Sequence, residues 1–346
     1  MIYSYGVSLP GTYHIKKGIV CQDYHKIEHC GEDMAIAVVA DGLGSAEFAD
    51  YGSRIAATTA AEYCKKQIDP SGKEILEIIK GSFVAAYDAV EQEAKEKERG
   101  TENYDTTLTL AVLFRDDLYY GHSGDSGIIA LTAEGRYEAV TSQQRDEDGR
   151  VFPLHFKNKW KFAKYKHKVS AVLLATDGML ETFFPFYIRN AEVKIHVSLV
   201  QFFMCKHSMM LEELGQDMIK TRITNFMENI PNEQVSDDKT VTVLINASIA
   251  TKEQPEEYYM EPDWAELKKK HDEEWKREAY PEMFVVKKTT PETPAEIKEE
   301  IFPEDIEFMP KRKKPESRKN VKIIVAVVII LCVAAVALGL FLFYFS

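Results

Sequence analysis

The feature of this chain that most restricts its fold is a short apolar run that ends in an aspartate. Residues 35–40 read AIAVVA and lead directly into Asp41 and Gly42. An apolar run of this length is typical of a buried strand. A carboxylate at its end is costly to bury unless it has a partner. Asp41 therefore either caps the next element or holds a cation.

The same arrangement recurs along the chain. Asp177 ends VSAVLLATDG, and Asp125 lies in GHSGDS between two strand-like runs. Asp23 stands in CQD, and Asp237 and Asp238 directly precede TVTVLI. Any one of these aspartates is typical of a turn, but the whole set indicates one convergent site. A calcium-binding loop would hold its ligands within about twelve residues, and these positions are much further apart.

The chemistry of such a site follows from its charge. Carboxylates that are packed together raise one another's pKa unless a cation lies between them. Oxygen ligands alone suit Mg²⁺ or Mn²⁺. Gly42 and Gly178 allow tight turns, where a backbone carbonyl can also serve as a ligand. Two such ions can share and acidify one water, which then attacks phosphorus in line.

Apolar periodicity predicts an α+β fold. The strand-like runs are Ala35–Ala40, Thr107–Phe114, Leu118–His122, Gly127–Thr132, Tyr137–Thr141, Ala171–Thr176 and Thr240–Ile245. The helical runs are Ala49–Gln67, Lys73–Lys97 and Met209–Glu228. Short strands joined by tight turns favour antiparallel pairing. Strands and long helices that occur in blocks indicate sheets packed together with helices outside.

The C-terminus predicts a membrane anchor. Ile323–Phe345 is an uninterrupted apolar run of 23 residues. At about 1.5 Å per residue, such a helix reaches roughly 34 Å and crosses a hydrocarbon core of about 30 Å. The preceding KRKKPESRKNVK holds seven Lys or Arg residues. The positive-inside tendency then places the rest of the chain in the cytosol.

Composition divides the chain into three parts. We expect a globular domain over 1–248, a charged and largely disordered linker over 249–320, and a transmembrane helix over 321–346. A short helix is expected near 263–277, and a second small domain is the alternative for the linker. The net charge of −12 argues against nucleic-acid binding. The five cysteines contain no CxxC pair, so neither a disulfide framework nor a zinc site is expected.

Six segments resemble a known family. CQD, VVADGLGS, DTTLTLAVL, GHSGDSGIIAL, LLATDGM and SDDKTVTVLI occur in the order found in metal-dependent protein phosphatases of the PPM, or protein phosphatase 2C, family. The resemblance covers about residues 3–248 and is nearest to the bacterial branch. It implies a four-layer α-β-β-α sandwich of two antiparallel sheets flanked by helices. It also implies hydrolysis of phosphoserine and phosphothreonine in proteins.

The resemblance assigns roles to the aspartates. Asp41 would bridge two Mn²⁺ or Mg²⁺ ions, with the Gly42 carbonyl on one of them, and Asp177 and Asp237 would complete the other. Asp23 would orient metal-bound water without binding the ions. Asp41 and Asp23 are thus the expected catalytic residues.

Asp125, together with Asp177, resembles the site of a third and weaker ion. Asp238 falls where the family usually has Asn, and Gln22 replaces a frequent Glu. We expect both side chains to orient groups around the metals rather than to bind them.

Other departures affect phosphate binding. The arginine that holds the substrate phosphate in the family has no counterpart, because Gly18 stands at its position. His14, Lys16 or Lys17 could supply the donor instead. An amine is a point charge rather than a bidentate fork, so an amine donor would orient phosphate less firmly.

Several other residues have two interpretations. In the basic and aromatic segment 143–167, Lys159, Trp160 and Phe162 either contact a phosphoprotein substrate or belong to a solvated loop. His122 is expected to be a core histidine with satisfied hydrogen bonds. The threonines at 106 and 107 are expected to serve β-propensity and packing.

The sequence thus predicts a protein serine/threonine phosphatase tethered to the cytosolic face of a membrane, where it opposes a Ser/Thr kinase. A metal-activated water would attack phosphorus directly, without a covalent enzyme intermediate. The alternative is a catalytically weak, phosphatase-like module that binds phosphoproteins at the membrane. The missing arginine and Gln22 motivate this alternative, and the retained aspartates argue against it.

Overall fold

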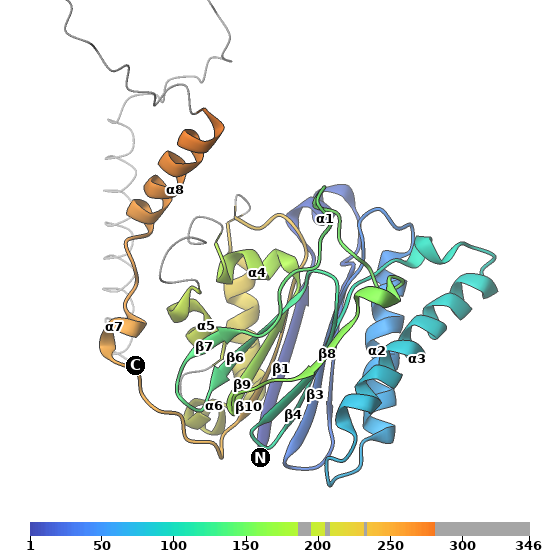
Figure 1. The fold of residues 1–346 in the computed structure, drawn as a ribbon, viewed down its shortest axis with the longest axis horizontal. Helices are drawn as coiled ribbons and strands as arrows, with labels where there is room; N and C mark the ends of the chain where they lie inside the picture. Colours follow the sequence, from blue (N-terminus) through green and yellow to red (C-terminus); the bar gives the residue numbers. More distant parts are fainter. Residues whose placement is uncertain (186–194, 205–207, 232–233, 281–346) are drawn as a thin grey trace, which may run out of the picture. The chain divides into compact units, whose positions relative to one another are not determined.

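Two five-stranded sheets face each other in the computed structural model, which describes residues 1–185, 195–204, 208–231 and 234–280 (Figure 1). The order in the first sheet is β1 (Ile2–Leu9), β10 (Lys239–Asn246), β9 (Val169–Ala175), β6 (Gly127–Thr132) and β7 (Tyr137–Ala139). The order in the second sheet is β2 (Asp23–His29), β3 (Met34–Asp41), β4 (Leu108–Phe114), β5 (Asp117–Ser123) and β8 (Lys161–Lys164). Every pairing is antiparallel, as predicted.

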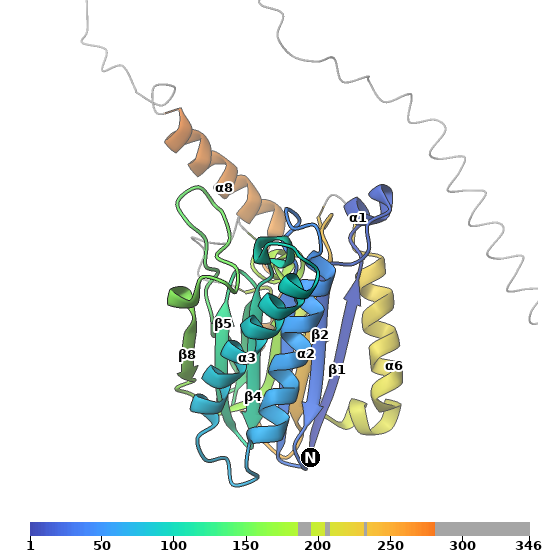
Figure 2. The ribbon, with the colours of Figure 1, turned by 90° about the vertical axis from the view of Figure 1, so that its right-hand side faces the viewer.

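Helices cover the outer face of each sheet. The helices α2 (Ala49–Gln67) and α3 (Ile75–Glu96) lie on the second sheet, and Figure 2 shows them in front of it. On the first sheet lie α4 (Asp177–Phe183), α5 (Val197–Phe203) and α6 (Ser208–Glu228). The remaining helices are α1 (Thr12–Lys17), α7 (Glu256–Tyr259) and α8 (Trp264–Ala279). The predicted four-layer α-β-β-α sandwich is therefore confirmed.

Three apolar clusters hold these layers together. One lies between the sheets, where Val39 of β3 and Leu174 of β9 belong to the same buried group. The second joins α2 and α3 to the second sheet, and Phe83 is its largest fully buried side chain. The third joins α4, α5 and α6 to the first sheet. Each sheet is thus buried on both faces, which explains why its central strands are almost continuously apolar.

Strand register brings the aspartates to one end of the sandwich. In the β2–β3 pair, Asp23 lies opposite Asp41. The β9–β10 pair places Ala175 opposite Val241, so the end of β9 and the start of β10 meet. Asp125 lies in the turn that joins β5 to β6. The topology therefore gathers acidic positions that are far apart in the sequence.

The structure differs from the predicted elements at several edges. The predicted helices agree with α2, α3 and α6 to within two residues at each end, and the helix expected near 263–277 is α8. Three strands were missed, namely β1, β2 and β8. These strands lie at the sheet edges, where polar residues replace the apolar run that marks a buried strand.

No helix among the described residues is long and apolar enough to cross a membrane. The predicted span over 321–346 and the linker beyond residue 280 lie outside the described residues.

Candidate metal centre

Three aspartates from separate elements meet at the acidic end of the sandwich. Asp41 ends β3, Asp125 lies between β5 and β6, and Asp177 begins α4. Carboxylate oxygens of these three residues lie within 4.8 Å of one another. They line a cavity of about 270 Å³, and Asp237 and Gly42 line it as well. The structure thus brings together all five residues that were predicted to hold metal.

Asp41 is fixed through its backbone by two threonines. The Asp41 N–H donates to Thr107 Oγ1 at 2.9 Å, and the Thr107 N–H donates to the Asp41 carbonyl at 2.8 Å. Thr106 Oγ1 donates to the same carbonyl at 2.9 Å. These threonines were expected only to pack, and the structure shows that they also set the position of the carboxylate-bearing residue.

Position 42 requires glycine, because backbone carbonyls of other segments pack closely against it. A Cβ atom at this position would lie 2.4 Å from the Ala49 carbonyl oxygen and 2.8 Å from that of Gln22. The Gly42 N–H donates to the Gln22 carbonyl at 3.1 Å. The turn after β3 is therefore packed directly against the segment that precedes β2.

The carboxylates lack enough positive charge around them. Burial, followed by repulsion from Asp23 and Asp177, raises the pKa of Asp41 well above its usual range. Burial and repulsion from Asp177 raise the pKa of Asp125 to about 7, against the opposing effect of Arg145. Buried Asp125 Oδ1 has no hydrogen-bond partner among the described residues. A hard divalent cation satisfies these oxygens and removes the repulsion, so this donor set fits the metals that the family uses.

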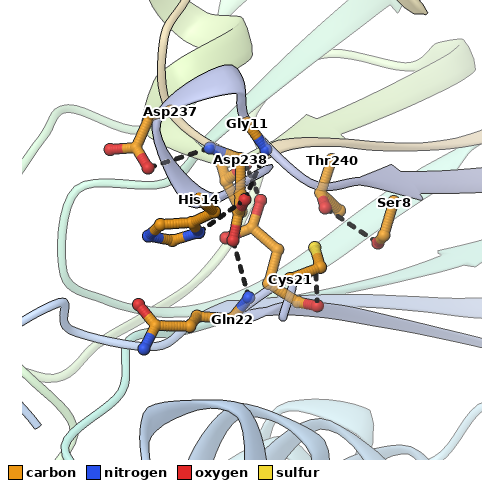
Figure 3. A network of polar contacts seen from close by, with 10 residues as sticks. Ser8, Gly11, His14, Cys21, Gln22, Asp237, Asp238 and Thr240 are labelled. Atoms are coloured by element: carbon orange, nitrogen blue, oxygen red, sulfur yellow. Dashed lines mark hydrogen bonds and ion pairs between the residues drawn. The ribbon is translucent and has the colours of Figure 1, made fainter. Parts of the chain in front are cut away.

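Asp238 finds its hydrogen-bond donors within the protein itself, as Figure 3 shows. Its Oδ1 accepts from the Gly11 N–H at 2.6 Å and from His14 Nδ1 at 2.8 Å. Its Oδ2 accepts from the Gln22 N–H at 2.6 Å. Asp238 therefore ties the start of α1 to the segment before β2, and these bonds occupy both of its oxygens.

Asp23 lies behind the cavity. It is 5% exposed, and Thr176 Oγ1 donates to its Oδ2 at 2.7 Å. Burial and repulsion from Asp238 raise the pKa of Asp23 well above its usual range. Its place opposite Asp41 fits the predicted role of orienting groups at the metals.

The three candidates for phosphate binding lie in different environments. His14 is buried, lines the cavity and uses Nδ1 to bind Asp238. Lys16 and Lys17 are exposed on α1, and neither lines the cavity. Gln22 does line it. Only His14 among the three candidates is therefore placed to meet a substrate in this arrangement.

Arg145 is the residue that the sequence interpretation missed. Its Nη2 lies 2.5 Å from Asp125 Oδ2 and 3.0 Å from Asp177 Oδ2. The segment 143–167 had been recognised as basic and close to the site, but no sequence pattern indicates which of its cations turns inward.

The other half of that segment belongs to the fold. Trp160 and Phe162 pack edge-on against Phe83, with ring centroids 5.5 and 5.0 Å apart. Trp160 Nε1 donates to the Leu154 carbonyl at 2.9 Å. Lys159 Nζ lies over the Phe152 ring, 4.4 Å from its centroid. The solvated-loop interpretation was therefore wrong for Trp160 and Phe162, which close the edge of the second sheet, and contact with a substrate stays a prediction.

His122 is a core residue, as expected. It is 1% exposed, and its Nε2 bonds to the Ser142 carbonyl at 3.1 Å. Because a carbonyl only accepts, Nε2 carries the proton and Nδ1 accepts from Thr109 Oγ1 at 2.9 Å. Burial lowers the pKa of His122 to about 4, so the neutral form fills this position.

The comparisons with known proteins agree with this fold. A family model described as protein phosphatase 2C matches residues 10–228 of the 346. Among solved structures, a variant of a bacterial serine phosphatase is 12% identical, with 73% of this chain and 100% of that chain covered and a TM-score of 0.50. No curated protein matches the chain.

Two further structures are similar at lower scores. Serine/threonine phosphatase Stp1 from Staphylococcus aureus is 14% identical, with 71% of this chain and 95% of that chain covered and a TM-score of 0.47. PppA of Pseudomonas aeruginosa is 18% identical, with 70% and 97% covered and a TM-score of 0.47. Because the family model covers more than half of the chain, the chain belongs to the protein phosphatase 2C family. It is an enzyme of the protein serine/threonine phosphatase class.

Proposed function

We propose that this chain hydrolyses phosphoserine and phosphothreonine in proteins with two divalent cations, Mn²⁺ or Mg²⁺, at the acidic end of the sandwich. The observation that supports this most strongly is the meeting of Asp41, Asp125 and Asp177 within 4.8 Å. Three carboxylates at this separation stay ionised together only beside positive charge. The donors for the two ions are Asp41, the Gly42 carbonyl, Asp177 and Asp237, and Asp125 extends the group.

When bound, two divalent ions at this site lower the pKa of a water and neutralise the charge of the phosphate. The chain's own residues hold the geometry. Thr106 and Thr107 fix the backbone of Asp41. Thr176 holds the Asp23 carboxylate through Oδ2, near enough to Asp41 for the two charges to interact. These bonds position the reacting groups before substrate arrives.

His14 is the residue that we assign to the substrate. Its Nδ1 is held by Asp238 at 2.8 Å, which fixes the orientation of the imidazole ring. Nε2 has no hydrogen bond to any described residue, and His14 lines the cavity. We therefore propose that Nε2–H donates to the phosphate or to the leaving seryl oxygen. His14 thereby supplies part of what the missing arginine would provide.

Turnover of p-nitrophenyl phosphate and of a phosphothreonine peptide by the full chain tests this function. We expect activity with Mn²⁺, none after EDTA, and recovery when Mn²⁺ is returned. Asp41→Asn should remove it, whereas the exposed Asp88→Asn in α3 should keep it. Activity that persists in EDTA or in Asp41→Asn would contradict the proposal. A binding-only module is not favoured, because unneutralised buried carboxylates serve no purpose in it.

We also propose that residues 321–346 anchor this enzyme in a membrane, with 1–248 as the cytosolic phosphatase domain and 249–320 as the linker. The 23-residue apolar run and the seven Lys or Arg residues before it support this proposal. A phosphatase in this position would oppose a Ser/Thr kinase on membrane-proximal substrates. The full chain should stay with membranes after an alkaline wash, whereas a chain truncated after Asn320 should be released. Equal release of both would refute the anchor.

A further inference from the structure

Arg145 contacts the metal centre in a way that an ordinary surface ion pair does not. A single atom, Nη2, lies 2.5 Å from Asp125 Oδ2 and 3.0 Å from Asp177 Oδ2. The side chain of Asp125 is 2% exposed and that of Asp177 is 22% exposed. The contact with Asp125 is a charge pair without hydrogen-bond geometry. One positive group thus bridges two carboxylates, as a bound cation would.

The loop that carries Arg145 is built to keep it there. The Gln144 N–H donates to the Gly124 carbonyl at 2.9 Å, and Gln144 Oε1 accepts from the Gly124 N–H at 3.2 Å. The residue before Arg145 is therefore bound to the residue before Asp125. The backbone also forms an isolated antiparallel bridge between Arg145 and Val151.

The rest of the loop holds the other arm of the guanidinium group. Arg145 Nη1 donates to the Gly149 carbonyl at 3.3 Å. Gly149 has a φ of +81°, a conformation that favours glycine. Asp146 Oδ1 accepts from the backbone N–H groups of Asp148 and Arg150 at 2.9 and 2.8 Å. With its loop closed in this way and both arms engaged, Arg145 gives up little side-chain freedom on pairing with the aspartates.

The position of Arg145 matters because it brings positive charge into a cavity lined by aspartates. Among the described residues that line the cavity, Arg145 is the only lysine or arginine, and four of the others are aspartates besides Asp41. The two carboxylates that it bridges are those that resemble the site of a third metal ion. A guanidinium group cannot lose its proton at any ordinary pH, so its positive charge is permanent.

We propose that Arg145 is a built-in cation that takes the place of a third divalent ion between Asp125 and Asp177. This inference rests on the proposed function, because it assumes that Asp41, the Gly42 carbonyl, Asp237 and the other oxygen of Asp177 hold two ions. The chain then needs two divalent ions for its resting state. It also resists loss of activity when the free metal concentration is too low to fill a weak third site.

Metal binding tests the proposal directly. Mn²⁺ is titrated into the metal-free full chain, and the number of bound ions and their affinities are measured by calorimetry and by equilibrium dialysis. We expect two bound Mn²⁺ ions for the wild type and three for Arg145→Ala. Added Mg²⁺ should compete with Mn²⁺ for the additional site. Arg145→Lys keeps the charge and should stay at two. The matched control is Arg150→Ala, which removes an exposed arginine from the same loop and should also stay at two.

One result would overturn the proposal, namely an Arg145→Ala protein that binds the same number of ions as the wild type. If that protein also has a raised KM for phosphopeptide, Arg145 is a phosphate-binding residue instead.

A wild-type chain that binds no Mn²⁺ and turns over no phosphopeptide would refute the proposed function. In that case, Mn²⁺ binding by Arg145→Ala still tests the inference about Arg145. A Mn²⁺ site gained by Arg145→Ala supports it, and no gain overturns it. Circular dichroism of each variant shows whether the chain has kept its fold.

Discussion

Asp41 and Asp238 lie at the same end of one sandwich and face opposite conditions. Asp238 accepts from the Gly11 and Gln22 N–H groups and from His14. The carboxylate of Asp41 is instead surrounded by those of other aspartates, which repel it. Hydrogen-bond donors make a buried carboxylate part of the scaffold, whereas unrelieved repulsion leaves it ready for a cation. Residue type alone therefore does not separate a structural aspartate from a metal ligand.

The largest expected effect comes from removing the ligand charge. Asp41→Asn should reduce Mn²⁺-dependent turnover by roughly 10³-fold, because a metal ion supplies several kcal/mol of transition-state stabilisation. In metal-free protein the same change should raise the melting temperature, because it removes repulsion. Steady-state kinetics and thermal unfolding in EDTA measure the two effects. A lower melting temperature in EDTA would show that Asp41 is as well satisfied as Asp238.

The opposite sign is expected at Asp238. Asp238→Ala leaves two buried donors, on Gly11 and His14, and a half-buried one on Gln22 without an acceptor. Each unsatisfied buried group costs about 1–3 kcal/mol, so we expect a loss of roughly 3 kcal/mol or more in the free energy of unfolding. Urea denaturation in EDTA measures it, with the exposed Asp88→Ala as control. Unchanged stability would mean that the network in Figure 3 does not hold the scaffold.

A buried histidine extends the comparison to pH. The pKa of His122 is lowered to about 4 in the folded chain by burial, against about 6.5 in an unfolded chain. The unfolded state therefore binds more protons below pH 6.5, and stability falls as pH falls. Between pH 8 and pH 5 this group should cost about 2 kcal/mol of stability at 1.36 kcal/mol per pH unit. His122→Gln should flatten that part of the pH profile of urea denaturation, and an unchanged slope would contradict the prediction.

The smallest effect on stability and metal binding is expected at Thr107, which bonds to the backbone of Asp41. Thr107→Val removes the hydroxyl group that accepts from the Asp41 N–H and keeps the side-chain shape. We expect a loss of about 1 kcal/mol in the free energy of unfolding and weaker Mn²⁺ binding in calorimetry. Thr107→Ser, which keeps the hydroxyl group, serves as control. Equal Mn²⁺ affinity in Val and Ser variants would show that Asp41 needs no help in positioning.

Much of the fold was predictable because its central strands carry their own signal. Residues 35–40 and 171–175 are apolar on both faces, since each sheet is covered by helices outside and by the other sheet inside. The edge strands β2 (DYHKIEH) and β8 (KFAK) are half-exposed. Their polar residues hide the strand pattern, and only pairing with β3 and β5 defines them.

The site could be predicted from the sequence about as well as the fold. Asp41, Asp125, Asp177 and Asp237 could be found because each one follows or precedes a strong strand signal, whereas Asp23 begins the edge strand β2, which has none. The role of Arg145 could not, because it depends on a loop closed by Gln144, Gly124 and Gly149. Local sequence does not show which way a long side chain turns. The saturation of Asp238 likewise depends on α1 and the segment before β2, which meet it only in the folded chain.

The proposed metal ligands extend from both sheets, so the buried layer between the sheets sets the distance between them. Asp41 ends β3 in the second sheet, and Asp177 lies two residues after the end of β9 in the first. Their separation is set by buried neighbours such as Ala37 and Leu174, which fill the space between the sheets. A change from Ala37 to a larger side chain would push the sheets apart. It would thereby weaken Mn²⁺ affinity, measurable by calorimetry, from a position that never contacts the ion.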